Sequence, residues 1–154
     1  MYHTIKQMLR IKDTSLTILN VSEEDVKGAH TLVGHAKLSP TPKACPDCGC
    51  TVKDADGRFQ LVKNGSKKVT IRFEPFNHLP LVMKLAKQRF FCRACQHHWT
   101  AQSYFVNPRC FIANHIRFKI IDLLKERISL TLIAKLCHVS VSTVLRILVS
   151  LRCY

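Results

Sequence analysis

Cys45-Pro46-Asp47-Cys48 and Cys92-Arg93-Ala94-Cys95 are the two stretches that decide how the middle of this chain folds. Each of these cysteine hooks places two thiols three residues apart, so both thiols can reach one ion from a tight turn. Together they supply four sulfur ligands, which is the set that tetrahedral Zn²⁺ takes in a closed structural site. Because such a site leaves no position open for water, we expect the zinc to hold the fold together and not to catalyse a reaction.

The other four of the eight cysteines lack this spacing: Cys50, Cys110, Cys137 and Cys153. A polar, mixed sequence follows Met1 in place of a signal-peptide core, and no apolar run is long enough to span a bilayer. This predicts a reducing cytoplasm, where thiols stay free to bind metal. Cys137 lies in an apolar helical pattern that is typical of a small core residue. Alternative metal ligands beside the hooks are Cys50, His97 and His98.

The charge of the chain favours a polyanionic partner. Lys and Arg number 24 and Asp and Glu number 10 in 154 residues, which gives a net charge of +14. The excess is regional, because Glu74 is the one acid between Arg58 and Cys95. Such a basic stretch is typical of nucleic-acid binding, although a solvated surface has the same composition. We expect double-stranded DNA as the partner, with no membrane and no small-molecule substrate.

The order of the patterns predicts an α+β protein in three parts. The first part, residues 1–43, has a short helical pattern and then alternation typical of strands at 15–21 and 31–38. We expect a short N-terminal segment of helix and strand here. Its residues suggest no chemistry.

The second part, residues 44–106, contains both hooks and predicts a small antiparallel zinc ribbon. Turn signals at 54–57 and 63–66 alternate with short strand patterns. So small a unit has little apolar interior, and the metal is expected to contribute much of its folding free energy. Four basic residues of its strands are candidates for phosphate contact, or else form a solvated outer face: Arg72, Lys84, Lys87 and Arg89.

The third part, residues 107–154, predicts a three-helix domain of the helix-turn-helix type. Apolar residues recur at helical spacing over 111–124 and 130–137, and again after Ser140, a candidate N-cap. Small Ala134 suits the point where the last two helices cross. His138 takes the turn position where glycine is usual, because histidine tolerates a positive φ better than most residues.

The last helix is expected to read DNA with its polar side. With Val144 and Ile147 beneath it in the core, the helix presents four residues outward: Ser140, Ser142, Thr143 and Arg146. Serine and threonine hydroxyls can meet phosphates or base edges, and arginine suits guanine in the major groove. An ordinary helical bundle with a polar surface is the alternative.

In this order the motifs resemble the ISL-three family of insertion-sequence transposases. The resemblance rests on Cys45–Gly49, on the strand Lys87–Phe91 that leads into the second hook, on Trp99, and on the helical run Val139–Ile147. It extends over essentially the whole chain, beginning with Ile5-Lys6 and Ile11-Lys12-Asp13. In that family this region is the N-terminal part that binds the inverted repeats at the ends of the element.

The resemblance implies a bacterial cytoplasmic protein associated with the nucleoid. Family members continue into a catalytic domain whose Asp-Asp-Glu set holds divalent metal. This sequence ends at Tyr154, and its acids do not form such a set, so we expect no enzyme in this chain. Alternatives are a regulator derived from a transposase, and a protein-interaction module that pairs with a second copy or with the intact transposase. A complete strand-transfer enzyme is the least favoured class.

Overall fold

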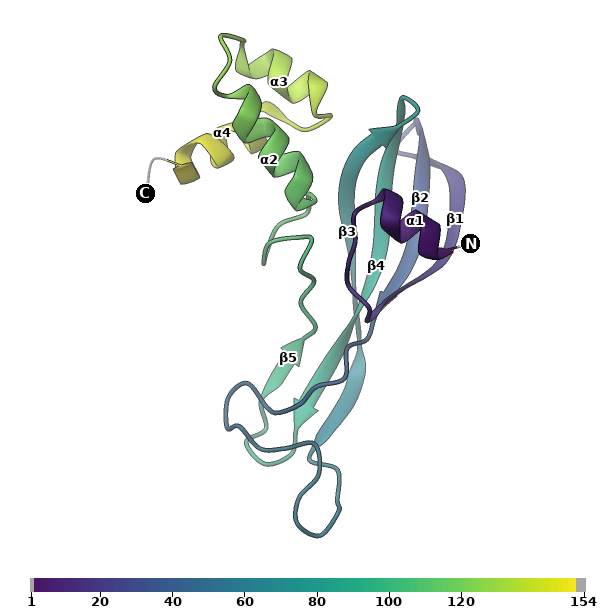
Figure 1. Ribbon diagram of the computed structural model, residues 1–154, viewed down its shortest axis with the longest axis vertical. Helices are drawn as coiled ribbons and strands as arrows, with labels where there is room; N and C mark the ends of the chain where they lie inside the picture. Colours follow the sequence, from purple (N-terminus) through teal and green to yellow (C-terminus); the bar gives the residue numbers. More distant parts are fainter. Residues whose placement is uncertain (1, 152–154) are drawn as a thin grey trace. The chain divides into compact units, whose positions relative to one another are not determined.

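The computed structural model describes residues 2–151 of the chain (Figure 1). Cys153 and the last three residues of the expected third part lie outside this range. The elements in chain order are α1 (Tyr2–Met8), β1 (Leu16–Val26), β2 (Ala29–Leu38), β3 (Leu61–Phe76), β4 (Leu79–Cys92), β5 (His98–Thr100), α2 (Asn114–Leu123), α3 (Leu130–Leu136) and α4 (Val141–Leu151).

One five-stranded sheet dominates the described residues. Its strand order is β1-β2-β4-β3, and β5 pairs antiparallel with the end of β4 (Figure 1). Two tight hairpins connect β1 to β2 and β3 to β4. Their turn residues, Lys27-Gly28 and Asn77-His78, all have positive φ, which is the conformation that two-residue hairpin turns require.

The expected fold class is therefore wrong. The two N-terminal strands do not form a segment of their own, and the strands near the hooks do not form a small separate ribbon. Instead β2 lies next to β4 in a single sheet. Both strands have buried residues along their length, including Val33 and Leu38 in β2 and Met83 and Leu85 in β4. Alternation along a strand indicates a buried face, but it does not indicate which other strand will be its neighbour.

The expected turn at 63–66 is also wrong, because these residues lie inside β3. Gly65 has a φ of 70°, and its carbonyl oxygen accepts a hydrogen bond of 2.8 Å from Nε2 of buried Gln88. A glycine with positive φ inside a strand is typical of a bulge or a close backbone approach. The strand therefore continues through a sequence that resembles a turn.

The chain divides into two compact units. The first consists of Met1–Val21, Gly34–Thr70 and Lys84–Tyr104, and the second of Ser22–Val33, Ile71–Met83 and Phe105–Tyr154. The first unit contains α1 and both hooks. The second contains α2, α3 and α4 together with two hairpin segments of the sheet.

Within the second unit the helices are attached to β3. Arg72 exchanges backbone hydrogen bonds with the segment before α2, donating to Phe111 at 2.8 Å and accepting from Ala113 at 2.9 Å. The rings of Phe73 and His115 lie 5.5 Å apart, and Nζ of Lys119 lies 2.9 Å from Oε1 of Glu74. Because of these contacts the three helices are not the independent helix-turn-helix domain that the sequence suggested.

The helices themselves begin and end close to the predicted residues. Their shared core consists of Ile116, Ile120, Ile133, Ala134, Cys137, Val144 and Ile147. Cys137 is 3% exposed, which confirms it as a small core residue. Among residues 2–151 no single helix is long and apolar enough to cross a membrane; only α3 and α4 taken together have that length and composition.

The turn between α3 and α4 confirms the prediction for His138. Its φ is 52°, its backbone N–H donates to Lys135, and the N–H of Val139 donates to Ala134. These two hydrogen bonds satisfy the last carbonyls of α3 in the manner of a Schellman motif. The axes of α3 and α4 are bent by 112° across this turn.

Candidate metal centre

The two cysteine hooks meet in space, as their spacing predicted. The Sγ atoms of Cys45, Cys48, Cys92 and Cys95 all lie within 4.8 Å of one another. The distance from Cys45 to Cys95 is 3.6 Å, and that from Cys48 to Cys92 is 3.7 Å. A zinc ion with Zn–S bonds of about 2.3 Å places tetrahedral sulfurs about 3.8 Å apart. These four cysteines therefore fit one tetrahedral metal ion.

Both hooks have the same backbone conformation. In the first, the N–H of Cys45 donates to the carbonyl of Cys50 at 2.9 Å, and Gly49 has a φ of 72°. In the second, the N–H of Cys92 donates to the carbonyl of His97 at 2.9 Å, and Gln96 has a φ of 59°.

Antiparallel bridges enclose the hooks at equivalent positions. Ala44 pairs with Thr51 around the first hook, and Phe91 pairs with His98 around the second. The second hook is thus the tight connection between β4 and β5. The first hook has the same turn conformation but lies in a loop, outside the named strands. Gln96 adopts at one hook the left-handed conformation that glycine adopts at the other.

Backbone N–H groups stabilise negative charge on the sulfurs. The N–H of Cys50 lowers the pKa of Cys48, and that of Cys95 is the main cause that lowers the pKa of Cys92 to about 6. Burial instead raises the pKa of Cys95 to about 12. Without a metal ion, backbone N–H groups thus favour the thiolate form of Cys48 and Cys92, and burial favours the thiol form of Cys95. A metal ion has to displace the Cys95 proton, so metal binding releases protons and is favoured as the pH rises.

The apolar surroundings of the cysteines are small. Cys45, Leu61 and Cys92 are buried together, and partly buried Val52 and Trp99 pack against them. Strand β5 holds Trp99 opposite Phe90, with ring centroids 5.4 Å apart. Two of the three buried residues are cysteines of the hooks, so this cluster buries little besides the candidate metal centre itself.

A fifth thiol lies against the four. The Sγ atom of Cys50 is 3.2 Å from that of Cys92, and this contact is the main cause that raises the pKa of Cys50 to about 12. His97 and His98 are not among the four clustered residues. The ring of His97 lies 6.0 Å from that of Trp99, and the ring of His98 lies 4.5 Å from that of Phe91. The sequence placed Cys50 beside the hook, but only the fold indicates which cysteine it contacts.

The four polar residues expected to read DNA lie on α4 and at its beginning. Oγ of Ser140 lies 2.9 Å from both Oγ of Ser142 and Oγ1 of Thr143, and it accepts the N–H of Thr143 at 3.3 Å. These hydroxyls therefore bond to one another at the helix start, where Ser140 serves as the N-cap. Arg146 is exposed one helical turn further along.

The four strand residues expected to contact phosphate do not share one environment. Arg72 is exposed on β3, where its backbone pairs with the segment before α2. On β4, Lys84 and Arg89 are exposed and Lys87 is half-buried. The burial pattern of β4 shifts by one residue between Leu85 and Gln88. In a regular strand, residues five positions apart point to opposite faces. Because of this shift, the side chains of Lys84 and Arg89 both reach solvent.

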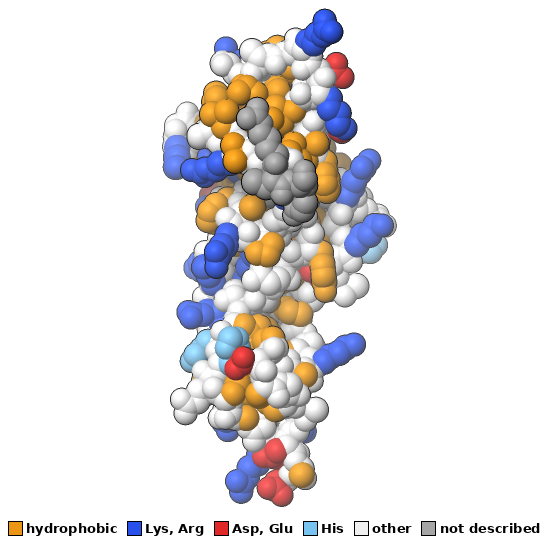
Figure 2. All heavy atoms as spheres, turned by 90° about the vertical axis from the view of Figure 1, so that its left-hand side faces the viewer, with side chains coloured by type: hydrophobic (Ala, Val, Ile, Leu, Met, Phe, Trp, Pro, Cys, Tyr) orange, Lys and Arg blue, Asp and Glu red, His pale blue; other side chains and the backbone are white. Residues whose placement is uncertain are grey.

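Basic side chains prevail over acidic ones on the face of the molecule drawn in Figure 2. Apolar side chains are also visible there. On α3 and α4 the exposed apolar residues are Leu132, Leu136, Val141, Leu145, Val149 and Leu151.

The fold and the cysteine centre define a sheet protein with a candidate four-cysteine metal site. Comparisons with family models, with curated proteins and with solved structures give no match.

Proposed function

We propose that this chain is a DNA-binding protein that a structural zinc ion stabilises. The observation that carries the proposal is the excess of exposed basic residues in the segment between Arg58 and Cys95, where Glu74 is the one acid. Of its basic residues all but half-buried Lys87 are exposed: Arg58, Lys63, Lys67, Lys68, Arg72, Lys84, Arg89 and Arg93. A surface of this kind attracts phosphate groups and releases their counterions. Zinc is proposed as the metal because four thiolates in a closed set are its usual structural ligands.

The electrostatics of β4 support phosphate contact. Burial lowers the pKa of Lys87, and the charge of Lys67 lowers it further. Two like charges this close destabilise the free protein. A phosphate group bound near both would relieve that repulsion, so Lys67 and Lys87 are a candidate pair for phosphate contact.

In this proposal α4 supplies sequence preference. Arg146 is the exposed basic side chain of its described residues, and Ser142 lies one turn before it. An arginine that forms two hydrogen bonds to guanine contributes about 1–3 kcal/mol of base discrimination.

The resemblance of the hooks and the final helices to ISL-three transposases supports a specific role. We propose that the chain binds the inverted-repeat ends of an insertion sequence in the bacterial cytoplasm, where reduced thiols hold the zinc. The catalytic Asp-Asp-Glu domain of that family is no part of this proposal. A stand-alone regulator that competes for the same ends would use the same contacts.

Selection of bound sequences from a random DNA pool, with and without a zinc chelator, tests the proposal. We expect an enriched sequence with the metal-loaded protein and none after chelation. Arg146→Ala should then weaken binding to the selected sequence about 5- to 150-fold, with a smaller effect on random DNA. Lys125→Ala is the matched control, because Lys125 is an exposed lysine paired with Asp122 at 2.8 Å. Equal loss on both DNAs would contradict base reading by Arg146.

Self-association is the second candidate function, and the exposed apolar residues of α4 favour it. Val141, Leu145 and Val149 recur every four residues and form one stripe, with Leu132 and Leu136 exposed on α3. An apolar stripe can bury itself against the same stripe of a second copy in a two-fold dimer.

Analytical ultracentrifugation over a range of protein concentrations tests the dimer. We expect a dimer that persists in 1 M salt and that Leu145→Glu converts to a monomer. Contacts to phosphate weaken steeply with salt. A chain that associates only with DNA would therefore lose its partner in 1 M salt, whereas an apolar dimer would persist. A monomer at all concentrations would exclude this candidate.

A further inference from the structure

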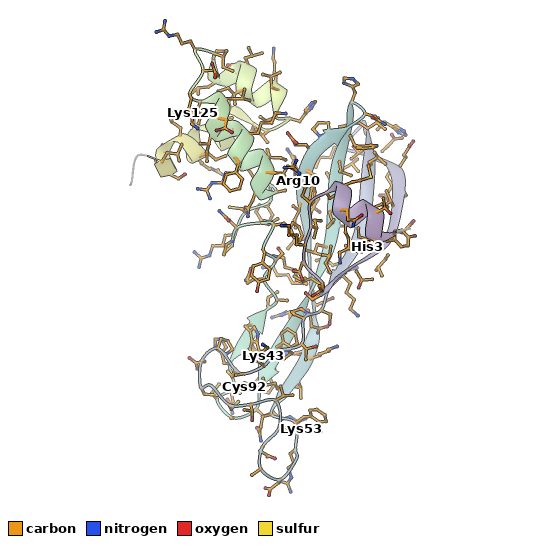
Figure 3. The ribbon with its side chains drawn as sticks, in the orientation of Figure 1. His3, Arg10, Lys43, Lys53, Cys92 and Lys125 are labelled. Carbon is orange, nitrogen blue, oxygen red and sulfur yellow. The ribbon has the colours of Figure 1, made fainter. Side chains whose placement is uncertain are left out.

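A basic groove lies along α1 and the loop that follows it. Its volume is about 860 Å³, and the side chains that line it include His3, Lys6, Gln7, Arg10, Lys12 and Thr14. Among residues 2–151, no acidic residue lines it. Figure 3 labels His3 on α1 and Arg10 just beyond the end of that helix. All of these residues belong to the first compact unit.

The end of α1 determines how the groove is built. The N–H of Ile11 donates to Lys6 at 2.9 Å and that of Arg10 donates to Gln7 at 3.0 Å, so the helix closes in a Schellman motif. Ile11 is buried and fixes the loop, while Arg10 takes the left-handed position with a φ of 54°. Glycine is the usual residue there, because other residues are strained in this conformation. Here the long cationic side chain of Arg10 takes the position of glycine, at the edge of the groove.

The polar groups around the groove leave it cationic. Nζ of Lys6 donates to the carbonyl of Leu16 at 2.8 Å, which holds the ammonium in place. The neighbouring acid, Asp13, does not line the groove, and its Oδ1 accepts hydrogen bonds from the N–H and Oγ of Ser15 at 2.9 Å and 2.6 Å. Arg10 and Lys12 are exposed and add two further positive charges.

We propose that this groove binds phosphate groups, with Lys6, Arg10 and Lys12 as the cationic contacts and Thr14 as a hydroxyl donor. Arginine and lysine are the side chains that recognise phosphate, the former with two parallel hydrogen bonds. Under the proposed function, the backbone of bound DNA supplies these phosphates, and the groove is a second contact apart from α4. A free phosphorylated molecule supplies the same chemistry.

Titration of the full, metal-loaded chain with pyrophosphate tests the groove by NMR. We expect amide shifts concentrated at residues 3–14. The double variant Arg10→Gln/Lys12→Gln should weaken pyrophosphate binding at least tenfold. Lys27→Gln/Lys43→Gln is the matched control, because it removes the same charge from two exposed lysines outside the groove. Equal weakening in both double variants, or shifts located elsewhere, would overturn the proposal.

The same variants titrated with a random DNA duplex identify the source of the phosphate. Loss of both pyrophosphate and DNA binding in Arg10→Gln/Lys12→Gln supports the groove as a DNA contact. Loss of pyrophosphate binding alone supports it as a site for a phosphorylated small molecule. If the wild-type chain binds no DNA, the proposed function fails, and the pyrophosphate titration still decides the groove.

Arg10→Gly separates ligand binding from a purely structural role. Cations near a helix C-terminus also interact favourably with the helix dipole. Glycine removes the side chain and relieves the left-handed backbone, so the melting temperature should stay equal or rise while pyrophosphate binding falls. A lower melting temperature with unchanged binding would assign Arg10 to the helix end alone and overturn its role in the groove.

Discussion

The cysteine centre and the helix cluster are held together by different means. Around the hooks the buried residues are Cys45, Leu61 and Cys92, whereas the cluster of α2, α3 and α4 includes fully buried Ile120, Ile133 and Val144 among others. Burial of each such aliphatic side chain contributes about 1.5–3 kcal/mol. The helix cluster therefore has its own hydrophobic stabilisation, whereas the hooks have a small core that a bound metal ion would have to supplement.

Removing one cysteine of the hooks should have the largest effect on metal binding and on local stability. We expect Cys92→Ser to abolish stoichiometric zinc binding, because free energies of structural zinc sites are on the order of 10 kcal/mol. Amide hydrogen exchange should then lose protection at 44–51 and 92–100 and keep it in α2, α3 and α4.

Cys50→Ser is the matched control for this loss. Cys50 lies 3.2 Å from Cys92 but is not one of the four clustered ligands, so its replacement should leave zinc content unchanged. Mass spectrometry of the native protein measures both variants. Zinc loss from Cys50→Ser and retention by Cys92→Ser would assign a different ligand set.

A cavity in the helix cluster should have the next largest effect on stability. It should destabilise the helices and leave the cysteine hooks unchanged, which is the reverse of removing a cysteine. Ile133 is completely buried, so Ile133→Ala should destabilise the helices by about 2–5 kcal/mol. Zinc content should stay at one ion per chain. Leu132→Ala is the control, because Leu132 is 43% exposed. Loss of zinc from Ile133→Ala would show that the two regions are not independent.

His138→Gly should stabilise the helix cluster slightly. A non-glycine residue in the left-handed region is strained, and glycine relieves this at a cost in unfolded-state entropy, so we expect a net gain of up to about 1 kcal/mol. Chemical denaturation followed by helix circular dichroism measures it. A loss of stability would indicate that the His138 side chain makes a contact that outweighs the strain.

The smallest expected effect is the pH dependence of stability at the β1–β2 hairpin. Hydrogen bonds that the His30 ring donates to the carboxylates of Glu23 and Asp25, at 2.9 Å and 3.3 Å, raise the pKa of His30. Its contribution to stability is therefore full below pH 6.5 and is lost as the pH rises through the raised value. NMR titration of the His30 ring should show a pKa above 6.5 that Glu23→Gln lowers. A chelator should not change it, because no cysteine of the hooks takes part.

Short-range features of the molecule were predictable from the sequence. The four clustered cysteines follow from two pairs spaced three residues apart, and the left-handed turn at His138 follows from the apolar pattern on either side of it. Gly65 shows where local patterns mislead. Its sequence is typical of a turn, but pairing with the neighbouring strand and the hydrogen bond from Gln88 keep it inside β3.

The sequence by itself determined the two cysteine hooks, the helices and the excess of positive charge, because the first two depend on residues a few positions apart and the third on composition alone. Only the tertiary structure decided that β2 lies beside β4 and that Cys50 contacts Cys92. These features depend on contacts between segments distant in the chain. Their free energy comes from the shared core, which no single stretch of sequence contains.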